Sequence, residues 1–342
     1  MRPIRALVVL LAALWLTAAA AEPKKVLKLA FRVAETSLDP AKIVDIYSRT
    51  ITPHIFEALY TYDHLARPAK IVPQLALGMP EASADFKTWT VKVRPGIFFA
   101  DDPAFKGKKR EVVAQDFIYA LQRIADPANK SPGWGFLDAQ VGFVGLREVR
   151  QTALDSRKPF DYDAPIEGLK ALDRYTVQFK LREPRPRLVE NLAASDLYGA
   201  QAREGAEFYG DAIDAHPVGT GPFRLKSWRR SSRIVLERNP GFREFLYEGE
   251  PAADDADGQA LLARFKGRRL PMVDEVEISI VEEFQPQWLT FLNREVDALA
   301  GVTGQLPSQF TNEAAPGGKL APRLARKGVQ MFRSLAPDAA FT

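Results

Sequence analysis

Short stretches in which apolar side chains occupy every second position constrain the fold of this chain most strongly. Residues 26–33 show the pattern first, with Leu27, Leu29, Phe31 and Val33 on one face. This period of two predicts a strand with one buried face. The same alternation recurs at residues 88–94, 175–181, 234–237 and 275–281.

Helical patterns lie between these predicted strands. Residues 113–124 carry apolar side chains three or four positions apart, and the pattern stops before Asp126. Residues 51–59 carry one at every fourth position, which predicts a helix with Pro53 at its first position and Thr52 as its cap. Interleaved strands and helices predict an α/β fold of the mixed α+β kind, built on a mixed sheet.

The composition excludes several kinds of site. The chain has 342 residues and no cysteine, so it has no disulfide framework, no thiolate metal site and no cysteine nucleophile. The three histidines, His54, His64 and His216, are never at ligand spacing, and we expect no metal and no cofactor. Lys and Arg number 47 against 43 Asp and Glu and are mixed along the chain, so we expect no nucleic-acid partner.

The first 21 residues have the pattern of a cleavable signal peptide. Arg2 and Arg5 precede the apolar run 6–16, and the alanines at 18–21 satisfy the small-residue rule for cleavage. The run is too short to span a hydrocarbon core of about 30 Å, although an uncleaved anchor is the alternative. No cysteine is present for lipid attachment. We therefore expect a soluble periplasmic protein that is not a lipoprotein.

Residues 244–270 differ from the rest of the chain in composition. An acidic segment rich in Gly and Ala, residues 248–258, is followed by a basic one at residues 264–269. Charge runs of this kind are usually solvated. We interpret the stretch as a surface insertion.

No arrangement of residues indicates catalysis. The chain has no G-x-S-x-G nucleophile elbow. Asp101 with Asp102, and Asp254 with Asp255, are predicted to lie in solvated loops, although counting carboxylates leaves a glycosidase pair open. Residues 219–222 (GTGP) lack the lysine of a phosphate-binding loop and predict a tight turn. We therefore expect that the protein is not an enzyme.

Six segments in a fixed order resemble one protein family. They are residues 37–40 (SLDP), 55–60 (IFEALY) with Asp63, 89–99 (WTVKVRPGIFF) with Asp101 and Asp102, 113–127, 217–223 (PVGTGPF) with 236–240 (LERNP), and 293–297 (NREVD). Together they resemble the periplasmic solute-binding proteins of the oligopeptide/dipeptide type, family 5, which feed ABC importers. Residues 131–137 (SPGWGFL) resemble the oligopeptide-binding branch.

The resemblance implies a two-lobe fold of the periplasmic-binding-protein kind, with the first lobe largely present and the second mostly missing. The expected division is signal peptide 1–21, first-lobe mixed-sheet domain 22–50 and 165–285 with the insertion 244–270, inserted subdomain 51–164, and the start of a truncated second lobe 286–342. Val113 departs from the family, in which Ser or Thr usually caps the helix containing Asp116. Family members are also considerably longer, so a fragment and a truncated gene both stay open.

The resemblance also implies ligand binding in place of chemistry. Two lobes close on a ligand about a hinge, and an inner-membrane ABC permease complex recognises the closed form. A small peptide ligand can be held as an added strand, which makes Ala34, Glu35, Thr36 and Ser37 candidate ligand-binding residues. Glu35 either attracts a ligand amine or is a solvated carboxylate at a strand end. We expect a monomer.

Two further groups of residues are candidates. Trp134 and Phe136 form either an apolar wall of the cleft or part of an ordinary core. Gly219, Thr220 and Gly221 are expected to shape a turn near the connection between the lobes, where glycine relieves the steric limits on φ.

Three other functions stay open. The first is that the chain is a family member that binds a non-peptide solute, such as a nickel chelate or haem. The second is that it is a periplasmic hydrolase on an unrelated fold, with clustered carboxylates or a serine site. The third is that it is a truncated product without a function.

Overall fold

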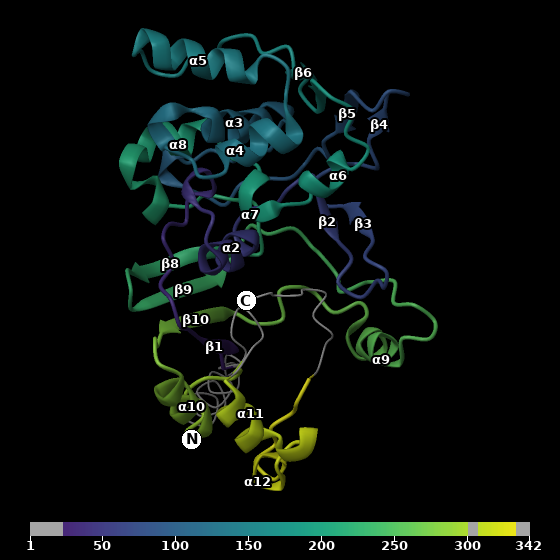
Figure 1. Cartoon of the computed structure of the whole chain (residues 1–342), viewed down its shortest axis with the longest axis vertical. Helices are drawn as coiled ribbons and strands as arrows, with labels where there is room; N and C mark the ends of the chain where they lie inside the picture. The colour runs from purple at the N-terminus through teal and green to yellow at the C-terminus, as the bar shows by residue number, and fades with distance from the viewer. Residues whose placement is uncertain (1–22, 300–306, 333–342) are drawn as a thin grey trace, which may run out of the picture.

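The computed structural model describes residues 23–299 and 307–332, and its first sheet has four strands. The strands are β1 (Val26–Phe31), β10 (Glu275–Ile280), β9 (Arg233–Arg238) and β8 (Phe223–Arg229), in this order across the sheet (Figure 1). β1 is parallel to β10, whereas the other neighbours are antiparallel. The sheet is therefore mixed, as predicted.

The alternation along these strands builds the core on one face of the sheet. Ile234, Leu236 and Ile278 are buried there with Phe31. The pattern does not hold to the end of the first stretch, because β1 ends at Phe31 and the side chain of Val33 is 55% exposed. The predicted signal peptide lies outside the described residues.

A second four-stranded sheet lies above the first in Figure 1. It consists of β4 (Glu81–Ala82), β5 (Thr88–Lys92), β7 (Thr176–Lys180) and β6 (Leu169–Asp173), all antiparallel. The predicted strands at residues 88–94 and 175–181 are thus partners in one sheet. This pairing differs from the expected division at residue 165, which grouped residues 165–285 with the first strand.

Helices pack against this second sheet and around it. The predicted helix at residues 113–124 is α3 (Ala114–Ala125). Its cap uses no side chain of Val113; instead, the backbone N–H of Val113 donates to Asp116 at 2.7 Å. The others in this part are α4 (Trp134–Phe136), α5 (Leu146–Ser156), α6 (Leu188–Asn191), α7 (Ser195–Tyr198) and α8 (Arg203–Tyr209).

The prediction of a helix at residues 51–59 is wrong. α2 (Ile46–Ile51) ends at the first residue of this stretch, and a single 3₁₀ turn, Thr52–His54, follows it. The backbone beyond the turn finds its partners elsewhere, because the carbonyls of Ile55 and Glu57 accept hydrogen bonds from Gly221 and Ala200. The chain then enters the hairpin of β2 (Tyr60–Tyr62) and β3 (Ile71–Pro73).

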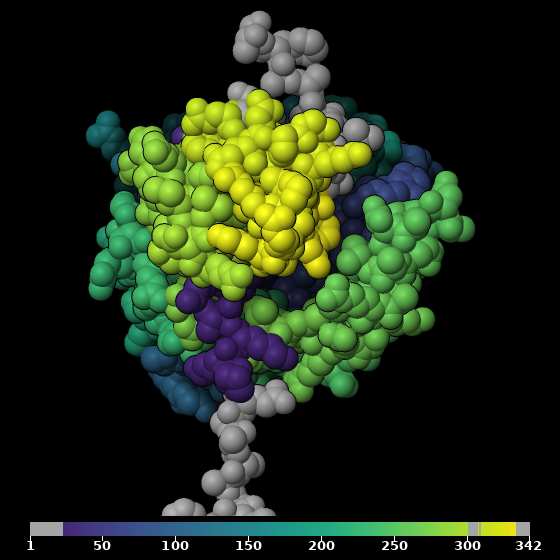
Figure 2. Space-filling view, turned by 90° about the horizontal axis from the view of Figure 1, so that it is seen from below, coloured from purple at the N-terminus to yellow at the C-terminus, as the bar shows by residue number. Residues whose placement is uncertain are grey.

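Two segments extend from the body of the molecule. Residues 244–270 contain α9 (Ala256–Phe265) and project beside the yellow α11 and α12 in Figure 2. The last described elements are α10 (Phe284–Leu292), α11 (Ser308–Ala314) and α12 (Pro322–Ala325), which share a small core around Trp288. Within residues 23–299 and 307–332, no helix combines the length and hydropathy needed to cross a bilayer.

Candidate ligand-binding site

Glu35 follows the first strand and is buried. Its side chain accepts a hydrogen bond at Oε1 from the indole N–H of Trp228, while Oε2 has no hydrogen-bond partner among the described residues. The guanidinium of Arg230 lies 4.0 Å from the ring centre of Trp228. Glu35 is 6% exposed, which excludes a solvated carboxylate at this position. A buried carboxylate oxygen without a donor is costly, so it favours a donor from outside the chain.

Thr36 and Ser37 are held by side chains of the segment around α2. The backbone N–H of Thr36 donates to Ser48 Oγ at 2.9 Å, and its hydroxyl donates to Asp45 Oδ2 at 2.5 Å. Burial of Asp45 raises its pKa, but donation by Ser48 and Thr36 outweighs burial and leaves the pKa below its ordinary value. Ser37 Oγ accepts from the backbone N–H of Asp39 at 3.0 Å. These bonds fix the turn that follows β1.

The backbone of Val33, Ala34 and Glu35 makes no hydrogen bond within the described part of the chain. These residues follow β1, which is an edge strand of its sheet. Two nearby apolar side chains, Val44 and Ile46, are 60% and 49% exposed. Free main-chain groups beside apolar surface can hold an extended ligand through strand-like hydrogen bonds.

Trp134 and Phe136 lie on α4 and form a separate feature. Trp134 is half-buried against the core around α3, and the guanidinium of Arg150 lies 4.9 Å from its ring centre. Phe136 is 50% exposed. No described hydrogen bond or ring contact joins either residue to Ala34–Ser37, and their role in a ligand wall stays a prediction.

Gly219 and Gly221 are required by close approach of two backbones. A Cβ on Gly219 would lie 1.9 Å from the carbonyl oxygen of Ile55, and one on Gly221 would lie 2.6 Å from that of His54. Neither glycine has a φ in the left-handed region, so the reason that we expected, relief of the limits on φ, is wrong. Gly221 N–H donates to the Ile55 carbonyl at 2.8 Å.

Thr220, between the two glycines, contacts the buried carboxylate of Glu57, which sequence reasoning missed. Its hydroxyl donates to Glu57 Oε2 at 2.9 Å. Arg243 donates to both oxygens of Glu57, and Gln74 donates to Oε1 at 3.3 Å. Glu57 stands in one of the quoted family segments, but local spacing gives no sign of its partners. The network joins the turn at residues 219–221 to the segment before β2.

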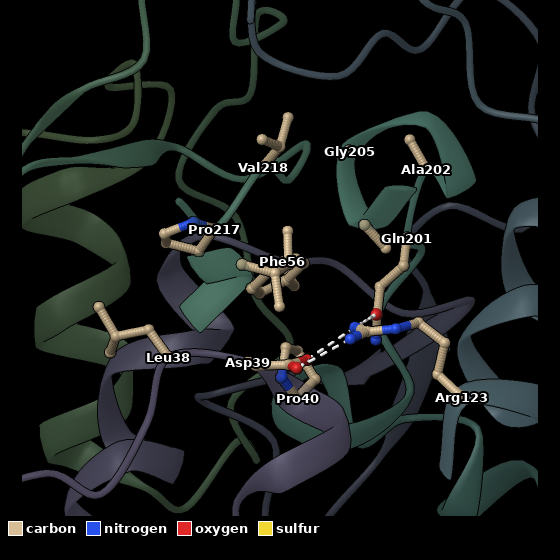
Figure 3. Close-up of a pocket in the computed structure, with 12 residues that line it drawn as sticks. Leu38, Asp39, Pro40, Phe56, Arg123, Gln201, Ala202, Gly205, Pro217 and Val218 are labelled. Carbon is tan, nitrogen blue, oxygen red and sulfur yellow. Dashed lines mark hydrogen bonds and ion pairs between the residues drawn. The ribbon is translucent and has the colours of Figure 1, made fainter. Parts of the chain in front are cut away.

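A small cavity lies near the C-terminal end of α3, in the region shown in Figure 3. Arg123 donates two hydrogen bonds to Asp39, at 2.7 and 2.8 Å, and a third to Gln201 Oε1 at 2.5 Å. Nε2 of Gln201 has no partner among the described residues. The cavity volume is about 20 Å³, which suits a single water molecule and not a solute.

The described residues include no group of three or more His, Cys, Asp or Glu side chains placed to hold a metal ion. The segment after β1 brings together a free main chain, a buried carboxylate and exposed aliphatic side chains. Groups of these kinds can hold a ligand through hydrogen bonds and apolar contact.

Comparison with known proteins gives one family. The family model described as bacterial extracellular solute-binding proteins, family 5 Middle, matches residues 70–331. The periplasmic oligopeptide-binding protein OppA of Salmonella typhimurium is 31% identical over 208 residues, which are 60% of this chain and 34% of that protein. Di/tripeptide-binding protein 2 of Pseudomonas aeruginosa is 28% identical over 269 residues, 74% of this chain and 45% of that protein.

Solved structures match over most of this chain. The OppA structure of Burkholderia pseudomallei has a TM-score of 0.60 at 22% identity and covers 86% of this chain and 49% of its own. The periplasmic murein tripeptide-binding protein MppA in its unliganded open form has a TM-score of 0.61 at 22% identity, covering 87% and 49%. These likenesses confirm the predicted fold class. The chain spans about a third to a half of the length of the relatives that it matches.

Proposed function

Because this chain belongs to the bacterial extracellular solute-binding proteins of family 5, we propose that it captures peptides for an ABC importer. In this proposal the ligand lies in a cleft between two lobes, and a membrane permease accepts it from the closed form. The chain acts in the periplasm as a monomer, binds no nucleic acid and catalyses no reaction. Relatives named as oligopeptide-binding and di/tripeptide-binding proteins support the choice of peptides.

The observation that carries the proposal is the free main chain of Val33, Ala34 and Glu35 beside the buried carboxylate of Glu35. A peptide that pairs with this segment satisfies backbone groups regardless of its side chains. The unpartnered Oε2 of Glu35 accepts a hydrogen bond from a peptide amine. Thr36 and Ser37 anchor the end of the segment, because their backbone N–H groups both donate to Ser48 Oγ.

The test is calorimetric titration of the full chain with peptides of two to five residues, each with a free or an acetylated amino terminus. We expect binding, and we expect Glu35→Gln to weaken the free-amine peptides by about tenfold while changing the acetylated ones little. The amide that this substitution introduces keeps an acceptor for the indole N–H of Trp228, so the variant isolates the charge. The matched control is Glu282→Gln, which removes an exposed carboxylate just after the neighbouring strand β10.

The other outcomes separate the alternatives. Binding of a nickel chelate or haem without any peptide would establish the non-peptide receptor. Hydrolysis of the peptides would establish an enzyme. A ligand at 100 times its Kd stabilises a fold by about 2.7 kcal/mol, so a melting curve that no ligand shifts would contradict every binding function.

A further inference from the structure

Four cations lie within six residues at the end of α9. We call Arg264, Lys266, Arg268 and Arg269 the basic turn. All four are exposed, and none of them is ion-paired with a carboxylate among the described residues. Two of the six acidic residues of the same excursion have partners of their own: Glu250 pairs with Lys70 at 2.6 Å, and Asp255 caps α9 by accepting from the backbone N–H of Gly258. Asp254 and Asp257 lie near Asp255 at the other end of α9 from the basic turn.

The basic turn is a defined structure. Gly267, with a φ of +75°, reverses the chain after α9. Its N–H donates to the carbonyl of Tyr247 at 3.0 Å, and Tyr247 N–H donates back to the carbonyl of Arg268 at 2.8 Å. The guanidinium groups of Arg264 and Arg268 lie 4.9 and 5.3 Å from the ring centre of Phe265. Hydrogen bonds and ring contacts thus hold the positive charges together on one projection.

Apolar side chains are exposed on the same excursion. Leu246 forms an isolated bridge with Arg269, and Leu246, Phe245 and Leu261 are 37%, 46% and 38% exposed. Figure 2 shows the excursion standing out at one side of the molecule. Three hollows in the described part of the chain, at the end of α3, beside β6 and before β1, are lined by other residues. The surface of the excursion offers positive charge next to apolar area.

We propose that the basic turn docks on an anionic phospholipid surface. A lipid head-group layer is fluid and needs clustered cations with adjacent apolar side chains, whereas a folded protein partner needs a complementary shape. The basic turn and the neighbouring Leu246 supply these clustered cations and apolar side chains. The docking does not depend on ligand capture, and it would hold the protein beside the membrane where an importer lies.

The test is co-sedimentation of the full chain with vesicles of phosphatidylcholine alone or with about one third phosphatidylglycerol. We expect binding to the anionic vesicles, and we expect the four-fold change R264Q, K266Q, R268Q and R269Q to weaken it at least about tenfold. Salt at about 0.5 M should abolish the preference. Every variant keeps residues 1–22, so lipid binding by the apolar run 6–16 is the same in all.

Two further variants make the result specific. Replacing Lys106, Lys108, Arg157 and Lys158 by glutamine removes the same charge from other exposed turns, and should leave vesicle binding unchanged. Replacing Arg264, Arg268 and Arg269 by lysine keeps the charge, and should retain binding because a lipid surface needs no bidentate fork. Equal loss in both glutamine variants, no preference for anionic vesicles, or loss on changing Arg to Lys would each overturn the proposal. The last would indicate a protein partner.

Discussion

Arg243 donates two hydrogen bonds, of 2.7 and 2.8 Å, to the two carboxylate oxygens of Glu57, which lies 186 residues before it in the chain. The Glu57 side chain is 3% exposed and that of Arg243 is 23% exposed. This buried ion pair links the segment after β9, which carries Arg243, to the segment before β2, which carries Glu57. Thr220 adds a hydrogen bond to the same carboxylate.

Glu57→Ala should lower the free energy of unfolding by about 3 kcal/mol, because it leaves Arg243 and Thr220 without their acceptor. Urea denaturation measures the loss. The control is Glu250→Gln in the exposed pair with Lys70, where we expect a change below about 1 kcal/mol. Equal effects in the two variants would show that the Glu57 network is not a stabilising contact.

Gly219→Ala should lower stability by about 3 kcal/mol or more, because the added Cβ meets the rigid carbonyl of Ile55 at 1.9 Å. Thermal unfolding followed by circular dichroism measures the change. Gly78→Ala is the matched control, since a Cβ there meets no atom within 4 Å. A Gly219→Ala variant that melts like the wild type would contradict the close approach of the two backbones.

Arg123→Met should cost about 3–5 kcal/mol, because the buried carboxylate of Asp39 loses its bidentate partner. Adding Asp39→Asn should restore part of the loss, since the amide leaves no buried charge and keeps an acceptor for the Ala41 N–H. Chemical denaturation of the two single variants and the double variant gives the coupling energy. Strictly additive losses would mean that the pair does not act as a unit.

Glu111 should make stability fall at acid pH. Donation by the backbone N–H of Gly96, at 2.7 Å, and by Arg174, at 3.0 Å, lowers the pKa of Glu111 below its ordinary value of 4.5. A carboxyl with a lowered pKa stabilises the fold above the unfolded value and loses that contribution as the pH falls through the folded one.

Urea midpoints between about pH 3 and pH 7 measure this contribution. Glu111→Gln should be less stable than the wild type at neutral pH, and the difference should shrink below about pH 4.5. The exposed Glu183 offers a control, because Glu183→Gln should leave the shape of the pH profile unchanged. A constant deficit of Glu111→Gln across the range would argue against the charged hydrogen bonds.

Local periodicity predicted the strands because each strand buries one of its faces in a core. Val177 and Phe179 of β7 are buried as the alternation requires. The same reasoning failed at residues 51–59, where a spacing of four arises in a chain that is not helical. There the backbone of Ile55 and Glu57 bonds to Gly221 and Ala200, and such distant partners leave no trace in local spacing.

The site was predictable to a smaller extent. The segment after β1 was identified, but the burial of Glu35 depends on Trp228, 193 residues further along the chain. The Glu57–Arg243 pair was missed for the same reason. Spacing shows which face of an element is buried, and it cannot show which distant side chain meets that face.

The parallel pairing of β1 with β10 has a consequence for the order in which the chain becomes structured. Hydrogen bonds beside this pair join residues 249 positions apart. At about 5–20 residues per second, a ribosome needs roughly 10–50 s to make the chain between them. The hairpin of β8 and β9 can close as soon as it emerges, whereas β1 has to wait for its neighbour. The first strand to be synthesised is thus among the last to be ordered.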